Sequence, residues 1–334
     1  GTVDSFLIAR MTRGLHHVTD PTNASRTLLY DIGTGQWSQE LCDPFGVPMS
    51  ALPEIVASYG EFGRSDPTAF LGIDAPIAGI AGDQQAALVG QAGFHVGSAK
   101  CTYGTGSFLL VHTGDVIARS AHGLLTTVAL GHPDGHRDFA LEGGVFVTGA
   151  AVQWLRDGLG IIDKASDIEE LAASVPDSGG VVFVPALTGL GAPDWDPSAR
   201  GLIIGITRAT TRAHIARAAL EAIAFSVRDV VALMGEEGRV PLECLKIDGG
   251  AASNNLLCQL QADALSLVVD RSAQLQTTGL GAAFLAGLGT GIWPSVDALA
   301  TTRASSGVFE PGPKNDAAYS IWRDAVGRAK NWSG

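Results

Sequence analysis

The chain has 334 residues, of which 46% are hydrophobic and 17% charged, a composition typical of a soluble globular protein. Its length exceeds what one ordinary hydrophobic core holds, so we expect more than one domain. The formal net charge of -12, with only 22 lysine and arginine residues, disfavours nucleic acid, because phosphate binding needs a basic surface. These features favour a small-molecule partner.

Four scattered cysteines, Cys42, Cys101, Cys244 and Cys258, show neither the CxxC spacing of a zinc site nor a disulfide framework. We expect core thiols in a reducing, cytoplasmic compartment. The most apolar window, 279–293, is shorter than the roughly 20 residues that a bilayer span requires. The sequence therefore predicts no membrane segment, and no signal peptide is visible.

The first half of the chain changes from helical to β patterns. A helical pattern opens the chain, turn formers over 50–75 predict a surface excursion, and the apolar run 76–81 between Gly and Pro predicts a buried strand. Residues 98–143 favour β structure. Strands are expected at 108–112, 124–130 and 139–142, with a hairpin loop at 131–135.

The second half alternates helices with strands, which predicts a mixed-sheet α/β domain. The region 93–98 is the best candidate for a domain boundary. The expected helices are 149–159, 211–234, 254–265 and 279–288, and the expected strands are 181–184, 245–247 and 267–269.

Asp83 stands in a tight glycine turn, Gly82-Asp-Gln-Gln, after the predicted strand at 76–81. In an open α/β sheet, ligands bind at the carboxyl ends of the strands. A carboxylate there can accept a proton from a substrate hydroxyl, hold Mg²⁺, or cap the following helix. The turn alone leaves all three roles open.

Three further glycine turns are candidates for ligand binding. The turn at 103–108 offers backbone N–H groups and hydroxyls to an anion, although a plain hairpin turn has the same pattern. The turn at 248–255 opens a helix, where Asn254 can contact a ligand or cap the helix. The turn at 148–154 places Gly149 at a helix start with Gln153 one turn inside, and by itself predicts only close packing.

Taken together and in this order, these turns resemble the FGGY family of carbohydrate kinases, and most closely its glycerol-phosphorylating members. Gln84 and Gln85 after the aspartate look like those members, whereas xylulose-phosphorylating members usually show Asp-Asn. The resembling stretches are HVTDPTNASRTLLYDIGTGQW from His17, PIAGIAGDQQAALVGQ from Pro76, KCTYGTGSFLL from Lys100, LEGGVFVTGAAVQWLRD from Leu141, FVPALTGLGAPDWDPSARGLIIGITR from Phe183 and IDGGAASNNLLCQLQAD from Ile247.

The resemblance implies an α/β, actin-like ATPase (ribonuclease H-like) fold and transfer of the ATP γ-phosphoryl group to glycerol. It implies that Asp83 is the catalytic base and lies near Mg²⁺, that Gln84 contacts glycerol, and that Phe108 packs on the glycerol carbons. The residues that fall where the family binds the nucleotide are Thr105, Gly149, Gln153, Gly250 and Asn254.

The sequence also departs from the family pattern. The family's Asp-x-Gly-Thr phosphate loop is not visible, so we expect a fragment in which 1–92 is the C-terminal remnant of the N-terminal domain and 93–334 is a complete C-terminal domain. We expect such a fragment to have little or no kinase activity alone. A basic inhibitory loop is not expected over 61–74, where Arg64 is the only basic residue.

Two other functions stay open at this point. The first is a kinase of the same family for another polyol or sugar, such as xylulose. The second is a nonenzymatic module that binds nucleotide. The resemblance also implies a homo-oligomer, dimer or tetramer, by analogy alone.

Overall fold

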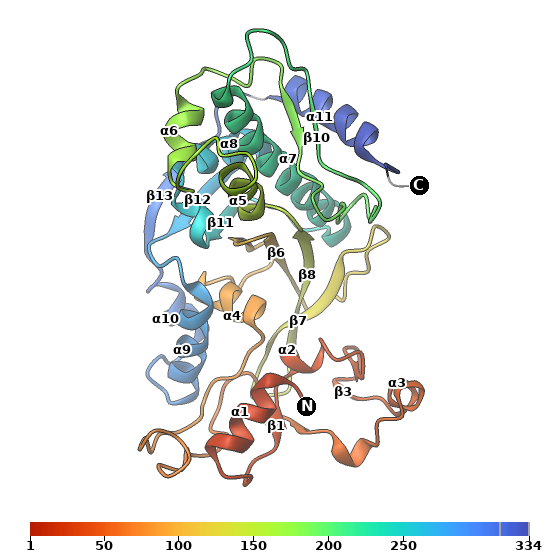
Figure 1. The fold of residues 1–334 in the computed structure, drawn as a ribbon. Coiled ribbons are helices and arrows are strands. Elements are labelled where there is room, and N and C mark those ends of the chain that lie inside the picture. Colours follow the sequence, from red (N-terminus) through yellow and green to blue (C-terminus); the bar gives the residue numbers. More distant parts are fainter. Residues whose placement is uncertain (314, 333–334) are drawn as a thin grey trace.

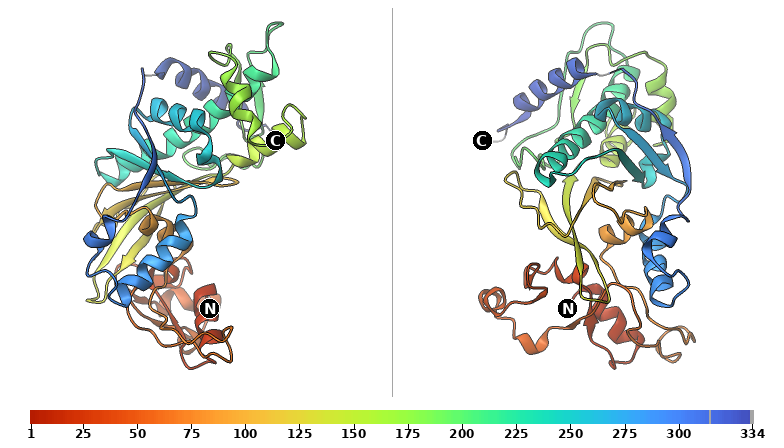
Figure 2. Two further views of the ribbon diagram at one scale, coloured as in Figure 1. Left: turned by 90° about the vertical axis from the view of Figure 1, so that its left-hand side faces the viewer. Right: turned by 180° about the vertical axis from the view of Figure 1, so that it is seen from behind.

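The computed structural model describes residues 1–313 and 315–332. A central sheet separates helices above it from helices below it, and the N-terminal segments lie at the bottom (Figure 1). The side and rear views place the last helix, α11 (Asp316–Ala329), on the upper part of the molecule, far from the N-terminus (Figure 2). The described part of the chain contains no helix that is long and apolar enough to cross a membrane.

The helices vary from single turns to a 27-residue rod. They are α1 (Val3–Met11), α2 (Pro21–Ala24), α3 (Gln39–Cys42), α4 (Asp83–Gly90), α5 (Gly149–Asp157), α6 (Asp167–Ala173), α7 (Arg212–Gly238), α8 (Asn255–Leu265), α9 (Thr277–Gly289), α10 (Val296–Ala300) and α11 (Asp316–Ala329), with 3-10 turns at Asp43–Phe45, Met49–Ala51 and Gly250–Ser253.

The strands form one large sheet and three small pairs. They are β1 (Val18–Thr19), β2 (Tyr30–Asp31), β3 (Gln36–Trp37), β4 (Glu54–Ile55), β5 (Ala99–Tyr103), β6 (Ser107–Gly114), β7 (Leu125–Gly131), β8 (Arg137–Val145), β9 (Val182–Val184), β10 (Leu202–Ile204), β11 (Cys244–Asp248), β12 (Val268–Ser272) and β13 (Ser305–Phe309).

The seven-stranded sheet has the order β13-β12-β11-β5-β6-β8-β7. β11 pairs parallel with both β5 and β12. The other pairs in the sheet, β12–β13, β5–β6, β6–β8 and β7–β8, are antiparallel. The hairpin β5–β6 stands in the middle, where Tyr103 pairs with Ser107 across the turn. This mixed sheet confirms the predicted α/β class.

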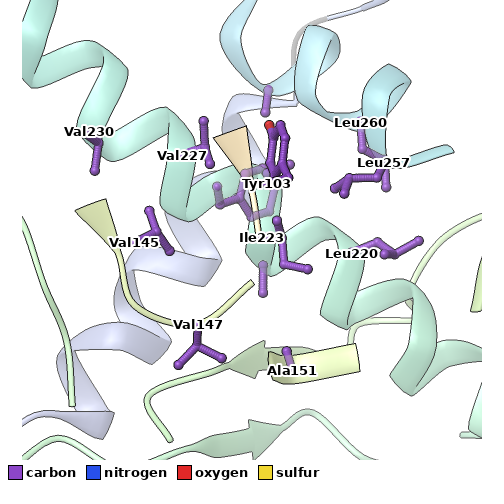
Figure 3. Packing of buried hydrophobic residues seen from close by; sticks show 14 of the residues in the cluster. Tyr103, Val145, Val147, Ala151, Leu220, Ile223, Val227, Val230, Leu257 and Leu260 are labelled. Carbon is purple, nitrogen blue, oxygen red and sulfur yellow. The ribbon is translucent and has the colours of Figure 1, made fainter. Parts of the chain in front are cut away.

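Alternation along β6 supplies both faces of the sheet with apolar side chains. Leu109 and Val111 belong to the main core with α7 and α8, whereas Leu110 packs with Leu88 of α4 on the opposite face. Figure 3 shows Tyr103 in the main core, close to Ile223 and Val227 of α7. The sheet is therefore covered on both sides, and its central strands are buried.

α4 and α9 pack closely because glycines leave their backbones bare at the contact. A Cβ on Gly281 would lie 1.7 Å from the carbonyl oxygen of Ala86, and one on Gly90 would lie 2.2 Å from that of Thr277. Side chains at these positions would force the helices apart. The contact holds a helix from the second half of the chain against the helix that follows the first glycine turn.

The predicted strand at 76–81 is wrong. This segment is extended but forms only isolated bridges, Tyr59 with Gly79 and Arg64 with Pro76. Its apolar residues still contribute to a hydrophobic core, since Ile80 packs with Ile8 and Val18. An apolar run can be buried against α1 and β1 without joining a sheet, which periodicity alone does not distinguish.

Most predicted elements of the second half are confirmed to within a few residues, among them α5, α7, α8, α9, β9, β11 and β12. Sequence patterns did not predict α6, α10, α11, β10 or β13. α11 nevertheless closes the upper layer, since Trp322 is buried and donates its indole N–H to the Phe183 carbonyl oxygen at 3.1 Å.

Candidate functional site

Three of the predicted glycine turns surround one cavity of about 490 Å³. The cavity lies between the β5–β6 turn, the start of α5, α6 and the start of α8. Its lining includes all five residues predicted to bind nucleotide, Thr105, Gly149, Gln153, Gly250 and Asn254. The fold thus brings Thr105 and Asn254, which are 149 positions apart in the sequence, to the same cavity.

Glycine is required where two of these turns touch each other. A Cβ on Gly149 would lie 2.6 Å from the Gly104 carbonyl oxygen, which accepts the Gly149 N–H at 3.0 Å. Gly249 has a φ of +89°, and a Cβ there would lie 2.4 Å from the Tyr103 carbonyl oxygen. By contrast, an added Cβ on Gly250 would meet nothing within 4 Å, so this glycine faces open space.

Asn254 caps a helix at the edge of the cavity. Its side-chain oxygen accepts the Leu257 N–H at 2.8 Å, so it caps α8, and it also lines the cavity. Glu169 of α6 accepts the N–H groups of Asn255 and Leu256 at 3.1 and 3.3 Å. The start of α8 is therefore fixed by two side chains beside the cavity.

Asp83 is the first residue of α4, after the N-cap Gly82, and its side chain is exposed. One carboxylate oxygen, Oδ1, accepts the Gln84 N–H at 2.8 Å. Asp83 is therefore not the N-cap that the alternative reading expected. Its Oδ2 accepts no hydrogen bond from the described residues.

Lys100 of β5 lies beneath this turn and is completely buried. Its ammonium group donates to Gln84 Oε1 at 2.5 Å, to Thr102 Oγ1 at 3.1 Å and to the Phe108 carbonyl oxygen at 3.3 Å. Burial lowers the pKa of Lys100, and the carboxylates of Asp248, Glu142 and Asp83 oppose that shift. One buried cation thus contacts two of the three predicted acceptor-site residues and interacts with the third.

A second buried group holds the turn from the N-terminal side. Asp20 is buried and accepts hydrogen bonds from Thr22 Oγ1 at 2.8 Å and Ser58 Oγ at 2.6 Å. Burial raises the pKa of Asp20, and its hydrogen bonds oppose the rise. The Thr22 hydroxyl oxygen in turn accepts the Gly82 N–H at 2.8 Å. The residue before Asp83 is therefore tied to a buried carboxylate.

Within residues 1–313 and 315–332, no group of three or more histidine, cysteine or acidic side chains is arranged to hold a metal ion. A magnesium ion that is bound chiefly by phosphate oxygens and one carboxylate does not need such a group. Asp83, with one oxygen already bonded to a backbone N–H and the other open, fits that arrangement.

Sequence reasoning missed Lys100, Thr22 and Asp20 as site residues. A single lysine inside the strand AKCTY is a signal that could have drawn attention to Lys100, because a charged side chain is rarely buried without a partner. The role of Thr22 depends on a contact 60 positions along the chain, and nothing in the local pattern predicts it.

Comparison with known proteins identifies the family from both halves of the chain. The N-terminal domain of the FGGY family of carbohydrate kinases matches residues 1–90, and the C-terminal domain matches residues 99–290. The chain is 52% identical over 335 residues to a glycerol kinase of Halorhodospira halophila, covering 99% of this chain and 66% of that protein. It is 53% identical to a glycerol kinase of Gloeobacter violaceus, covering 99% and 67%.

Solved structures agree with this assignment of the fold. A crystal structure of Plasmodium falciparum glycerol kinase with ADP aligns with a TM-score of 0.92 and 39% identity, covering 98% of this chain and 66% of that one. A ligand-bound xylulose kinase from Lactobacillus acidophilus aligns with a TM-score of 0.81 and 24% identity, which supports the fold alone. The actin-like ATPase fold expected from the resemblance is confirmed.

The chain spans about two thirds of the length of the relatives it matches. The expectation of a fragment that holds little beyond one domain is wrong, because both domain descriptions match this chain. Its matches extend from the first residue to 290 across both halves of the site. The chain therefore belongs to the FGGY family of carbohydrate kinases.

Proposed function

We propose that the protein transfers the γ-phosphoryl group of ATP to glycerol. The observation that carries this proposal is the arrangement of the β5–β6 hairpin. Its turn brings Thr105 to the cavity lined by the predicted nucleotide residues, while Lys100 of the same hairpin donates both to Gln84 and to the Phe108 carbonyl oxygen. Donor and acceptor sites are thus built on one rigid element.

The residues have complementary roles in this reaction. The acceptor hydroxyl lies against Asp83 Oδ2, which orients it and takes its proton as the hydroxyl oxygen bonds to phosphorus and the bond from phosphorus to the ADP oxygen breaks. Gln84 binds a glycerol hydroxyl, and the half-exposed Phe108 ring covers the carbon chain. Bound magnesium would supply positive charge to the phosphate oxygens, with the Asp83 carboxylate beside it.

The nucleotide side uses backbone groups more than charges. We propose that Thr105 and Gly149 contact the phosphates and that Gly250 and Asn254 line the adenosine end, with Gln153 between them. The openness at Gly250 and the volume of about 490 Å³ support this placement, because both leave space for a nucleotide. A homo-oligomeric state, a cytoplasmic location and a domain boundary near 93 stay predictions.

Coupled measurement of ADP release with Mg-ATP tests the proposal. We expect turnover with glycerol, and a kcat/KM for xylulose that is lower by about 100-fold or more. Faster turnover with xylulose or dihydroxyacetone would favour another kinase of the family. Nucleotide binding by calorimetry without turnover on any of the three acceptors would favour the nonenzymatic alternative and overturn the proposal.

A further inference from the structure

Two lysines on the same side of the central sheet bind α4, the buried Lys100 and the partly buried Lys246, and their partners differ. Lys246 of β11 donates to the carbonyl oxygens of Gln91 and Ala92 at 2.9 and 3.1 Å, so it binds the end of α4. Lys100 of β5 binds the beginning of the same helix through the Gln84 side chain. The first contact is with backbone only, whereas the second involves a predicted substrate-binding group.

The chemistry of the Lys100 contact fixes which end of the Gln84 amide faces outward. An ammonium group has three donors and no acceptor, so only the amide oxygen of Gln84 can face it. The 2.5 Å bond to Oε1 therefore turns the NH₂ group of Gln84 away from Lys100. An amide without such a partner could turn by 180° and present its oxygen instead.

This orientation matters for a substrate with adjacent hydroxyl groups. Asp83 is an acceptor and takes a hydrogen bond from the hydroxyl that reacts. With its NH₂ group outward, Gln84 donates to the oxygen of a neighbouring hydroxyl. The pair then offers one acceptor and one donor to a vicinal diol, whereas a flipped Gln84 would offer two acceptors side by side.

Phe108 is held by the same ammonium group. Lys100 donates to the Phe108 carbonyl oxygen at 3.3 Å, and the Phe108 ring is half-exposed while the neighbouring Leu109 and Leu110 are buried. The cation is fully buried, so it does not touch substrate itself. Its effect on substrate must pass through Gln84 and Phe108.

We infer that Lys100 is a positioning residue that fixes the Gln84 amide as a hydrogen-bond donor to the acceptor substrate and so sets affinity for vicinal diols. This inference rests on the proposed function, because it assumes that Asp83 and Gln84 bind the acceptor. It assigns a role in acceptor binding to a residue that neither the sequence nor the family resemblance singled out.

The test compares Lys100→Met with Lys246→Met, two removals of an ammonium group that binds α4. We expect Lys100→Met to raise the KM for glycerol by about tenfold or more, because Gln84 loses its hydrogen bond to the Lys100 ammonium group. The Kd for ATP should stay within about twofold of the wild-type value. Lys246→Met should leave both constants within about twofold. An unchanged KM for glycerol in folded Lys100→Met would overturn the inference.

A double-mutant cycle separates positioning from general loss of structure. In the Gln84→Leu background, Lys100→Met should raise the KM for glycerol little further, because the group that it orients is already absent. Additive effects on the KM would overturn the inference even if both variants are less stable. A wild-type protein without turnover on glycerol would overturn the proposed function, and with it this inference.

Gln84→Glu tests the orientation of the Gln84 amide even if Lys100→Met does not fold. The carboxylate can pair with Lys100, so the urea midpoint of unfolding should not fall, but both of its oxygens are acceptors and the outward donor is lost. We expect the KM for glycerol to rise by about tenfold or more. Wild-type glycerol affinity in Gln84→Glu would overturn the inference.

Discussion

The nucleotide cavity and the acceptor turn are joined by one hairpin but are built in different ways. The cavity is shaped by backbone, with glycines at 149 and 249 where strands and helices touch and an open glycine at 250. The acceptor turn is shaped by side chains, with Gly82 tied to Thr22 and Gln84 tied to Lys100. One site depends on the absence of side chains, and the other depends on buried polar partners.

This difference fits what each site has to bind. A polyphosphate is recognised well by backbone N–H groups and helix starts, which any sequence with the right turns supplies. A small polyol has only hydroxyl groups, so its recognition needs a donor and an acceptor fixed in orientation. Substitutions should therefore act on the two sites separately, which can be measured.

The largest effect is expected at Asp83. Asp83→Asn should lower kcat by about 100-fold to 10,000-fold, because the amide cannot take the proton of the acceptor hydroxyl. The Kd for ADP, measured by calorimetry, should change little, since the cavity does not include this side chain. A near-normal kcat would remove Asp83 from the role of base, and an equal loss of ADP binding would break the separation of the two sites.

Two neighbouring glycines test the backbone character of the cavity. Gly249→Ala places a Cβ 2.4 Å from the Tyr103 carbonyl oxygen at a φ of +89°, so unfolding in urea should show a loss of about 2 kcal/mol. Gly250→Ala meets nothing within 4 Å and should keep stability within about 0.5 kcal/mol. Its methyl group should instead raise the Kd for ATP by about tenfold by occupying ligand space.

The outcome for Gly250→Ala decides whether that glycine faces the nucleotide. Unchanged ATP affinity would mean that the ligand does not approach residue 250. A large loss of stability would mean that the open space seen there is absent in solution. In both variants the KM for glycerol should stay near the wild-type value if the sites are separate.

The chain contains Asp-Pro-Thr twice, which gives a matched pair for the acceptor side. In Asp20-Pro21-Thr22 the carboxylate is buried and Thr22 also accepts the Gly82 N–H, whereas the exposed Thr68 donates to the partly exposed Asp66. Thr22→Val should lower kcat by about threefold to tenfold and cost about 2 kcal/mol of stability, because the Gly82 N–H and a buried carboxylate lose a partner. Thr68→Val should change kcat little. Equal effects of the two substitutions on kcat would contradict the role of Thr22.

The sequence predicted the backbone-built site better than the side-chain-built one. Turns that contain Gly104, Gly149 and Gly250 are visible as glycines at the ends of periodic segments, and all three line the cavity. Glycine turns have a local cause, namely close approach or positive φ, so a local pattern can reveal them. Asp83 was found in the same way, through the glycine beside it.

The polar support of Asp83 was not predictable from local pattern. Lys100 and Gln84 are 16 positions apart, and Thr22 and Gly82 are 60 apart, so only the fold brings them together. The strand predicted at 76–81 failed for a related reason, since Ile80 is buried against α1 and β1 and not in a sheet. Burial is a tertiary property that many local structures satisfy.

A third cluster, on β6 and the β7–β8 hairpin, gives a reference that belongs to neither site. Asp138 lies 3.4, 3.0 and 3.1 Å from Nε2 of His112, His132 and His136. Burial alone would raise the pKa of Asp138, but the hydrogen bond with His132 and the nearby His112 and His132 imidazoles outweigh it and hold the pKa well below its usual value.

Asp138→Asn should therefore cost stability without changing either site. Because the folded pKa is lowered, this contribution is fully present above the unfolded pKa of about 3.9 and is lost as pH falls toward the folded pKa. Urea unfolding should show a deficit of about 1 kcal/mol at pH 6 that shrinks below about pH 4, with Asp134→Asn as the exposed control. A changed KM for glycerol or ATP in Asp138→Asn would show that stability loss alone reaches the sites. In that case, changes in KM or Kd in the other variants could not be assigned to the nucleotide cavity or to the acceptor turn.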